Sequence, residues 1–181
     1  MPSVGALLHN SCYSLVTHVF AVYFTGGAQH PPKQVKFDFY YMHCLNCSVF
    51  FSSFLAAPFI TKANKARLLE WKGRNDLAMY ASRRSPSPLL DEISNYKPAK
   101  SEESDWSSVI KRVLLHEDDG HASKLVRALK HGEEITKPYE GNPKFKIQGQ
   151  MWENLGNMGM SNVPCFACSV DREWLLLLTF Y

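Results

Sequence analysis

Two cysteines at C-x-x-C spacing, Cys44 and Cys47, lie in the aromatic stretch YYMHCLNCSVFF, residues 40–51. A second pair, Cys165 and Cys168, lies near the end of the chain. Four thiolates could hold zinc at tetrahedral angles, so a zinc-stabilised helical module is one interpretation. The two pairs are far apart, however, and helical periodicity continues on both sides of the first pair, where neither a zinc knuckle nor a redox motif would form. Chance spacing is the favoured interpretation.

His43, directly before the first cysteine, is a sharper candidate for chemistry. On a helix, residues three and four positions apart share a face. The stripe through His43 consists of Lys36, Tyr40, His43, Cys47, Phe50 and Phe54. We therefore predict that the imidazole is buried against an aromatic wall, either as a core histidine with one hydrogen-bond partner or as part of a catalytic pocket.

Lys72 is a second unusual residue, because it falls on the apolar side of a predicted amphipathic helix. Its stripe contains Leu68, Leu69, Asn75, Asp76 and Met79. Burial of an unpaired ammonium is costly, and three arrangements avoid that cost. The side chain reaches solvent, it pairs with Asp76 one turn on, or burial lowers its pKa until the amine is neutral. A neutral lysine amine can add carbon dioxide, and the resulting carbamate is an anionic oxygen ligand for a metal.

His121, in EDDGHASKLVRALKHGEE, lies at the start of another predicted helix. The positive end of a helix favours a neutral imidazole, which suits metal ligation or donation of a hydrogen bond. The alternative is a histidine that packs beside the helix start. The segment RRSPSP, residues 83–88, has two interpretations as well: a phosphorylated docking site or a loop that ends a helix. Neither a P-loop nor a G-x-G-x-x-G pattern is present.

Apolar residues recur at helical spacing along most of the chain, which predicts an all-α fold, an irregular helical array. The predicted helices cover approximately residues 7–24, 35–56, 61–83, 89–96, 105–115, 119–132 and 148–155. The predicted N-caps are Thr61, Ser104 or Asp105, and Asp118 or Asp119. Residues 1–163 form one helical region, whereas residues 164–181 show neither helical nor strand periodicity.

Composition narrows the class of protein. The chain has 181 residues, 45% of them apolar, and a formal net charge of +3, which fits one domain and does not indicate a nucleic-acid partner. The longest apolar stretch, Leu15 to Phe24, is too short to span a membrane and contains His18. Five cysteines and the lack of a secretory signal pattern favour a cytoplasmic location.

Four ordered blocks give the sequence a family resemblance. These blocks are FTGGAQHPPKQVKFDFYYMHC, NKARLLEWKGRNDLAMYASRRSP, EDDGHASKLVRALKHGEE and MWENLGNMG. Over about residues 23–158 the chain resembles the C-terminal half of the questin oxidase-like family of fungal oxidoreductases. Residues 164–181 depart from the family pattern and are interpreted as a non-native tail.

The resemblance implies an all-α enzyme of fungal secondary metabolism that acts on an anthraquinone-type polyketide, as in aflatoxin-type biosynthesis. It implies O2-dependent cleavage or expansion of a ring, by monooxygenase-like or dioxygenase-like chemistry. The implied cofactor is non-haem Fe(II) held by histidines and a carbamylated lysine, with NADPH as an optional reductant. Carried over onto this chain, the metal ligands are His43 and Lys72, and His121 is a candidate catalytic residue.

A flat aromatic polyketide substrate suits aromatic walls, which provide large stacking surfaces. Tyr40, Phe50, Phe54 and Trp71 are the predicted substrate-binding residues. Members of the family are much longer than this chain, so we interpret it as a fragment of a larger all-α enzyme. The alternative from another class is a catalytically inactive helical remnant, in which the same residues serve only as core.

Overall fold

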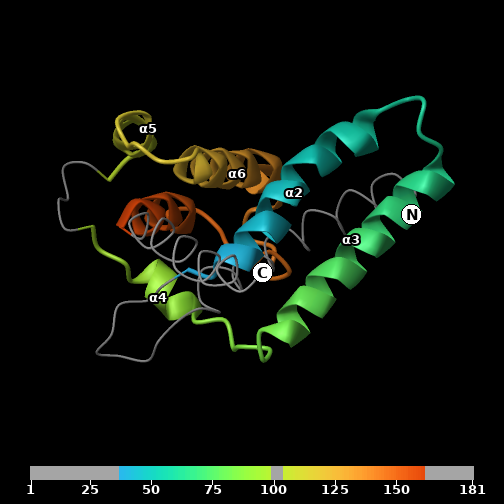
Figure 1. The fold of residues 1–181 in the computed structure, drawn as a ribbon, viewed down its shortest axis with the longest axis horizontal. Coiled ribbons are helices and arrows are strands. Elements are labelled where there is room, and N and C mark those ends of the chain that lie inside the picture. The colour runs from blue at the N-terminus through green and yellow to red at the C-terminus, as the bar shows by residue number, and fades with distance from the viewer. Residues whose placement is uncertain (1–36, 99–103, 162–181) are drawn as a thin grey trace, which may run out of the picture.

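The computed structural model describes residues 37–98 and 104–161 (Figure 1). All regular secondary structure in these residues is helical, without a strand, as predicted for an all-α fold. The elements are α2 (Phe39–Ala56), α3 (Lys62–Ser82), α4 (Leu90–Ser94), α5 (Trp106–Leu114), α6 (His121–Thr136) and the 3-10 helix η2 (Lys137–Tyr139). Residues 151–161 form a further helix. The predicted helix at 7–24 and the tail at 164–181 lie outside the described residues.

Side-chain caps set the start of three helices. The Asp38 carboxylate accepts from the backbone N–H groups of Tyr40 and Tyr41 at the start of α2. Thr61 caps α3 and Asp105 caps α5, which confirms both predicted N-caps. Each cap satisfies backbone donors that have no partner inside the helix, so helix starts could be located from sequence to within a few residues.

The helix that begins with His121 departs from its predicted end. The N-cap of this helix is Gly120 rather than the predicted Asp118 or Asp119, although the Asp118 carboxylate accepts from the N–H groups of Gly120 and Ala122. Its end is not at Gly132, since α6 continues to Thr136. Gly132 is buried, and its carbonyl accepts from the Thr136 hydroxyl at 2.7 Å, so packing overrides the helix-ending tendency of glycine. The final predicted helix starts at residue 151 rather than 148 and extends to at least 161.

α2 contacts two other long helices (Figure 1). α3 runs antiparallel to it: the Tyr41 hydroxyl donates to the Tyr80 carbonyl, and Lys65 Nζ donates to the Leu55 carbonyl. α6 runs in the same sense as α2, as contacts at both ends of the pair show. The rings of His43 and His121 meet near the helix starts, and Ser52 Oγ lies 3.1 Å from His131 Nε2 further along.

The main core lies where α2, α4, α6 and the helix at 151–161 meet. Its fully buried side chains include Met42, Leu45, Ile93, Leu125, Leu129, Ile147 and Leu155. Two buried asparagines of the MWENLGNMG block connect this helix to its neighbours. The Asn154 amide donates to the Ile93 carbonyl of α4, and the Asn157 amide donates to the Ser104 carbonyl before α5.

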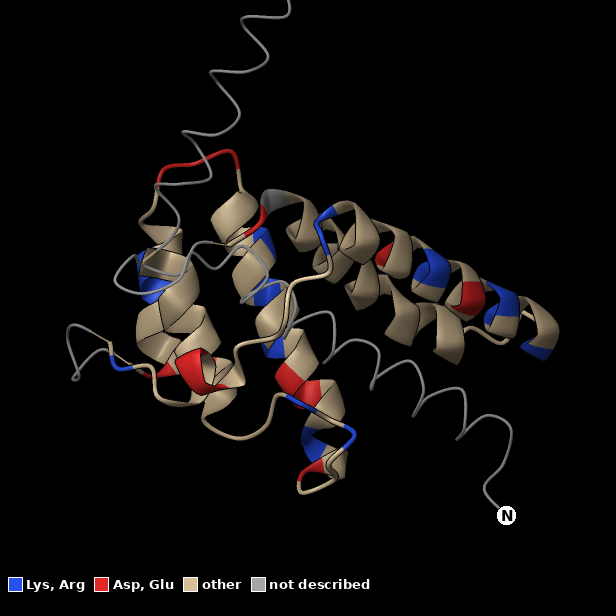
Figure 2. Cartoon of the chain, turned by 90° about the horizontal axis from the view of Figure 1, so that it is seen from below, with Lys and Arg blue, Asp and Glu red and all other residues tan. Residues whose placement is uncertain are grey.

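Charged residues of both signs are interspersed along the described helices rather than gathered on one basic face (Figure 2). Within residues 37–98 and 104–161, none of the helices has the length and hydrophobicity that a bilayer span requires.

Candidate functional site

His43 of α2 and His121 of α6 lie side by side at the starts of their helices. Their ring centroids are 6.3 Å apart and the ring planes meet at 82°, an edge-to-face arrangement. The structure thus brings together two of the predicted site residues, which are distant in sequence.

Asp119 orients one ring of the pair. Nδ1 of His121 contacts the Asp119 carboxylate, which lies just before the helix. The hydrogen bond lowers the pKa of Asp119, so the carboxylate is a good acceptor for an N–H at Nδ1. An imidazole held in this tautomer presents its other nitrogen, Nε2, as a lone-pair donor.

The prediction that the His43 imidazole is buried is wrong. The residue is exposed rather than buried. Its pKa is nonetheless lowered, first by partial removal of the ring from water and then by His121 and Lys124 nearby. The imidazole is therefore neutral at pH 7, the form that binds metals or accepts a proton.

The predicted aromatic wall is also on the outside of α2. Tyr40 is 48% exposed, Phe50 60% and Phe54 38%, and on α3 Trp71 is 63% exposed. The buried side of α2 is instead formed by Tyr41, Met42, Cys44, Leu45, Ser48, Phe51 and Leu55. α2 is apolar all round, so helical spacing defines its stripes without showing which one faces the core. These four aromatic side chains lie on exposed surface rather than in dry walls. Two of the rings already carry a guanidinium group: Arg83 lies 4.0 Å from the centroid of Tyr40, and Arg74 lies 5.6 Å from that of Trp71.

Lys72 adopts the second of the three arrangements considered for it. Its ammonium forms an ion pair with Asp76 one turn on, and the side chains are only 6% and 7% exposed. The Cys44 thiol of α2 faces the same carboxylate. Burial outweighs the attraction of Lys72 and raises the pKa of Asp76. Lys72 therefore belongs to the α2–α3 contact, whereas His43 lies on the side of α2 that faces α6.

The cysteines of α2 give the zinc interpretation little support. Cys44 is buried, Cys47 is exposed, and both are free thiols on one continuous helix. Burial and the negative charge of Asp76 raise the pKa of Cys44 to about 12, so the thiolate that zinc requires is disfavoured. Cys165 and Cys168 lie outside the described residues.

The Questin oxidase-like family model matches residues 9–129 of this chain. The chain belongs to this family. Similar proteins include a Baeyer-Villiger oxidase, ptaJ, of Pestalotiopsis fici, 40% identical over 141 residues that make up 76% of this chain and 32% of that protein. The oxidoreductase AflY of Aspergillus parasiticus is 38% identical over 155 residues, 86% of this chain and 30% of AflY. A questin oxidase of Aspergillus fumigatus is 38% identical over 158 residues, 86% of this chain and 35% of the relative. The chain thus spans about a third of the length of these relatives.

The histidine pair of this questin oxidase-like chain fits part of a metal site. Two imidazoles, one oriented by a carboxylate, are suitable donors for Fe(II) and similar metals. In the described parts of the chain, no group of three or more His, Cys, Asp or Glu side chains could hold a metal. A carbamate on Lys72 does not fit the observed contact, because it would place a second anion against the Asp76 carboxylate. The metal-ligand role of Lys72 stays a prediction.

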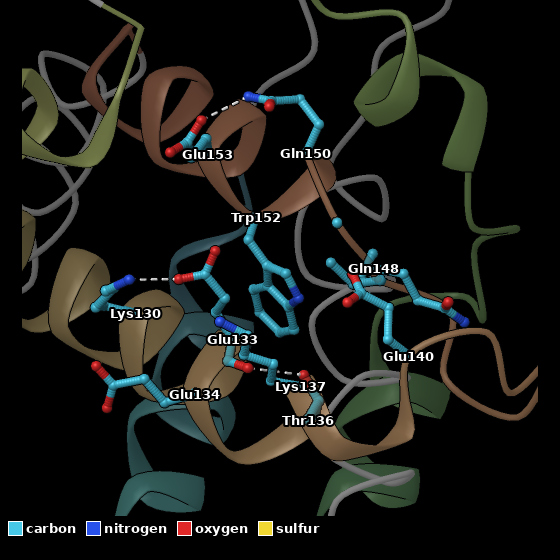
Figure 3. A pocket seen from close by; sticks show the side chains of 12 residues that line it. Lys130, Glu133, Glu134, Thr136, Lys137, Glu140, Gln148, Gln150, Trp152 and Glu153 are labelled. Atoms are coloured by element: carbon cyan, nitrogen blue, oxygen red, sulfur yellow. Dashed lines mark hydrogen bonds and ion pairs between the residues drawn. The ribbon is translucent and has the colours of Figure 1, made fainter.

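Two features were not found from the sequence. Asp119 acts on a residue two positions away, and the signal was the acidic pair that precedes Gly120 and the helix-starting histidine. The second is a cavity of about 390 Å3 at the other end of α6 (Figure 3). Four glutamates and two lysines line it, among them Lys130 paired with Glu133, while the Trp152 ring points into it. This acidic, polar lining does not suit a flat apolar substrate.

Proposed function

We propose that this chain is part of an O2-dependent oxidoreductase that cleaves or expands a ring of an anthraquinone-type polyketide in fungal secondary metabolism. Family membership and the names of the relatives support this class: Baeyer-Villiger oxidase, oxidoreductase and questin oxidase. The observation that carries the proposal within the chain is the contact between His43 and His121, with Asp119 behind the second ring.

In this proposal His43 and His121 are two of the protein ligands of an Fe(II) ion. When bound, such an ion supplies one-electron chemistry toward O2 that side chains lack. Asp119 keeps the proton on Nδ1 of His121, so that Nε2 is the ligating atom. The lowered pKa of His43 keeps its ring unprotonated at neutral pH. Further ligands would come from parts of the family protein that this chain does not span.

The exposed aromatic side chains of α2 and α3 are the proposed contacts for the polycyclic substrate. Tyr40 lies one turn before His43 on the same exposed face, and Phe50 and Phe54 continue that face along α2. Flat rings bury large areas against such side chains. Other residues would have to exclude water from this face, because the four aromatic side chains are exposed.

Metal binding tests the proposal independently of activity. The purified chain is loaded with Fe(II) under anaerobic conditions, and bound iron is measured for the wild type, His43→Ala, His121→Ala and His116→Ala. We expect the first two variants to lose iron and the third, a histidine outside the pair, to retain it. Equal iron in all four proteins would reject the histidine pair as a metal site. No iron in any of them would show that this chain does not hold the ion without the further ligands that the proposal assigns to the rest of the family protein.

The inactive helical remnant is the second candidate, and one observation favours it: Lys72, a predicted metal ligand, is instead buried in an ion pair with Asp76. A turnover assay with an anthraquinone substrate and O2, with and without NADPH, distinguishes the two. Product formation that stops when O2 is removed supports the oxidoreductase. Lack of product from an iron-loaded chain supports the remnant.

A further inference from the structure

The segment that follows α3 exposes two serines, each followed by proline. Arg84 and Ser85 have φ angles of 65° and 46°, so the chain turns sharply out of the helix. Residues 85–89 then have no regular secondary structure. Ser85 and Ser87 are both exposed. The whole sequence contains two Ser-Pro dipeptides, and these serines are the first residues of the two.

The backbone distinguishes the two serines. The N–H of Ser85 donates to the Tyr80 carbonyl at 3.1 Å, and the carbonyl of Pro86 accepts from the Tyr80 hydroxyl at 3.0 Å. Ser85 is thus held between two anchors on α3 and is in the left-handed region. Ser87 follows these anchors, and the proline after it favours the extended backbone in which kinases bind a substrate serine.

Two arginines, Arg83 and Arg84, precede Ser87, and their side chains have different surroundings. Arg83 contacts the start of α2. Its Nε lies 3.5 Å from the Asp38 carboxylate, and its guanidinium carbon lies 4.0 Å from the centroid of the Tyr40 ring. Arg84 is exposed. It stands three residues before Ser87, on the same outward-facing segment. The accessible recognition pattern is therefore an arginine at the third position before the serine and a proline directly after it.

We propose that Ser87 is a phosphorylation site for a serine/threonine kinase that recognises Arg84 and Pro88. The Ser87 hydroxyl attacks the γ-phosphorus of a nucleoside triphosphate; the new O–P bond forms as the bond to the leaving nucleoside diphosphate breaks. The hydroxyl proton passes to the base of the kinase. The product carries up to two negative charges within reach of Arg84, which suits charge-assisted hydrogen bonds that would order this segment. This inference does not depend on the proposed oxidoreductase activity.

The test uses the whole folded chain, ATP and a proline-directed kinase that prefers arginine three residues before the acceptor. Phosphate incorporation is measured over time and mapped by mass spectrometry for the wild type, Ser87→Ala, Ser85→Ala and Arg84→Gln. We expect Ser87→Ala to lose nearly all incorporation, Ser85→Ala to match the wild type and Arg84→Gln to be several-fold slower. Circular dichroism establishes that the variants fold alike.

Three results would overturn the proposal. The first is undiminished incorporation in Ser87→Ala, and the second is phosphate mapped to Ser85. The third is a folded chain that accepts no phosphate at Ser87 from a kinase that is active on a control substrate.

Discussion

The imidazole rings of His43 and His121 meet edge to face with centroids 6.3 Å apart, although they belong to different helices distant in sequence. The contact joins the start of α2 to the start of α6, where Asp119 already holds the second ring. Two imidazoles at one place, one of them oriented by a carboxylate, are the strongest indication of chemistry in the described part of this chain. The consequences of this pair can be tested one residue at a time.

The first prediction concerns Asp119. In Asp119→Asn the side chain can no longer accept with a full negative charge from Nδ1 of His121, so the preferred tautomer is weakened. Changes of this kind behind a ligating histidine cost about 10–100-fold in metal affinity. We expect a loss in this range for Co(II), an oxygen-stable substitute for Fe(II), measured by its visible absorption. Glu117→Gln, an exposed change in the same segment, is the control and should leave affinity unchanged; equal loss in both would contradict the role of Asp119.

The second prediction concerns pH. Burial lowers the pKa of His131, and partial desolvation with His121 and Lys124 lowers that of His43, both below the ordinary value of 6.5. Below pH 6.5 the unfolded chain therefore binds protons that the folded chain resists, so stability falls as the pH falls. Urea unfolding between about pH 5 and pH 7.5 should show this loss. His131→Gln should flatten the profile, and an unchanged slope would show that this ring does not contribute.

The third prediction concerns the buried ion pair of α3. Lys72→Met leaves the Asp76 carboxylate unpaired in the α2–α3 contact, and loss of one partner of a buried pair costs about 3–5 kcal/mol. The double variant Lys72→Met/Asp76→Leu should recover much of that loss. Arg74→Met breaks an exposed pair with Glu70 on the same helix and should cost only about 0–1 kcal/mol. Urea unfolding measures all three, and equal effects of Lys72→Met and Arg74→Met would contradict the buried pairing.

The fourth prediction concerns the cap of α2. Asp38→Ala removes the acceptor for two backbone N–H groups and the partner of Arg83, and should destabilise the chain by about 0.5–2 kcal/mol. Asp38→Asn keeps a capping oxygen but loses the charge, so its effect should be smaller. Thermal unfolding of both variants tests the order. Equal losses in Asn and in Ala would show that the ion pair, which both variants lack, dominates over the cap.

Local signals in the sequence were sufficient to place the starts of α3 and α5. Thr61 and Asp105 marked two helix starts because a cap acts on residues two or three positions away. The pairing of Lys72 with Asp76 was among the arrangements considered, since residues four apart on a helix are neighbours. Family membership was predicted from ordered sequence blocks and is confirmed by the match over residues 9–129.

Features that depend on tertiary packing could not be predicted from local signals in the sequence. The burial predicted for His43 was wrong because α2 has apolar residues on every side, and the choice of buried side is made by α3 and α6. The contact between His43 and His121 joins two helices that are far apart in the sequence, and helical periodicity within one helix does not predict which other helix it contacts. The end of α6 was misplaced at Gly132 because a buried glycine inside a packed helix looks like a terminator in the sequence.

Successive residues of α2 contact different helices. His43 contacts His121 of α6, whereas Cys44, about 100° further round the helix, faces the Asp76 carboxylate of α3. A roll of α2 about its own axis cannot adjust one of these contacts without disturbing the other. The buried charges of α3 therefore resist that rotation, and the spacing of the two imidazoles is set partly by the ion pair of α3.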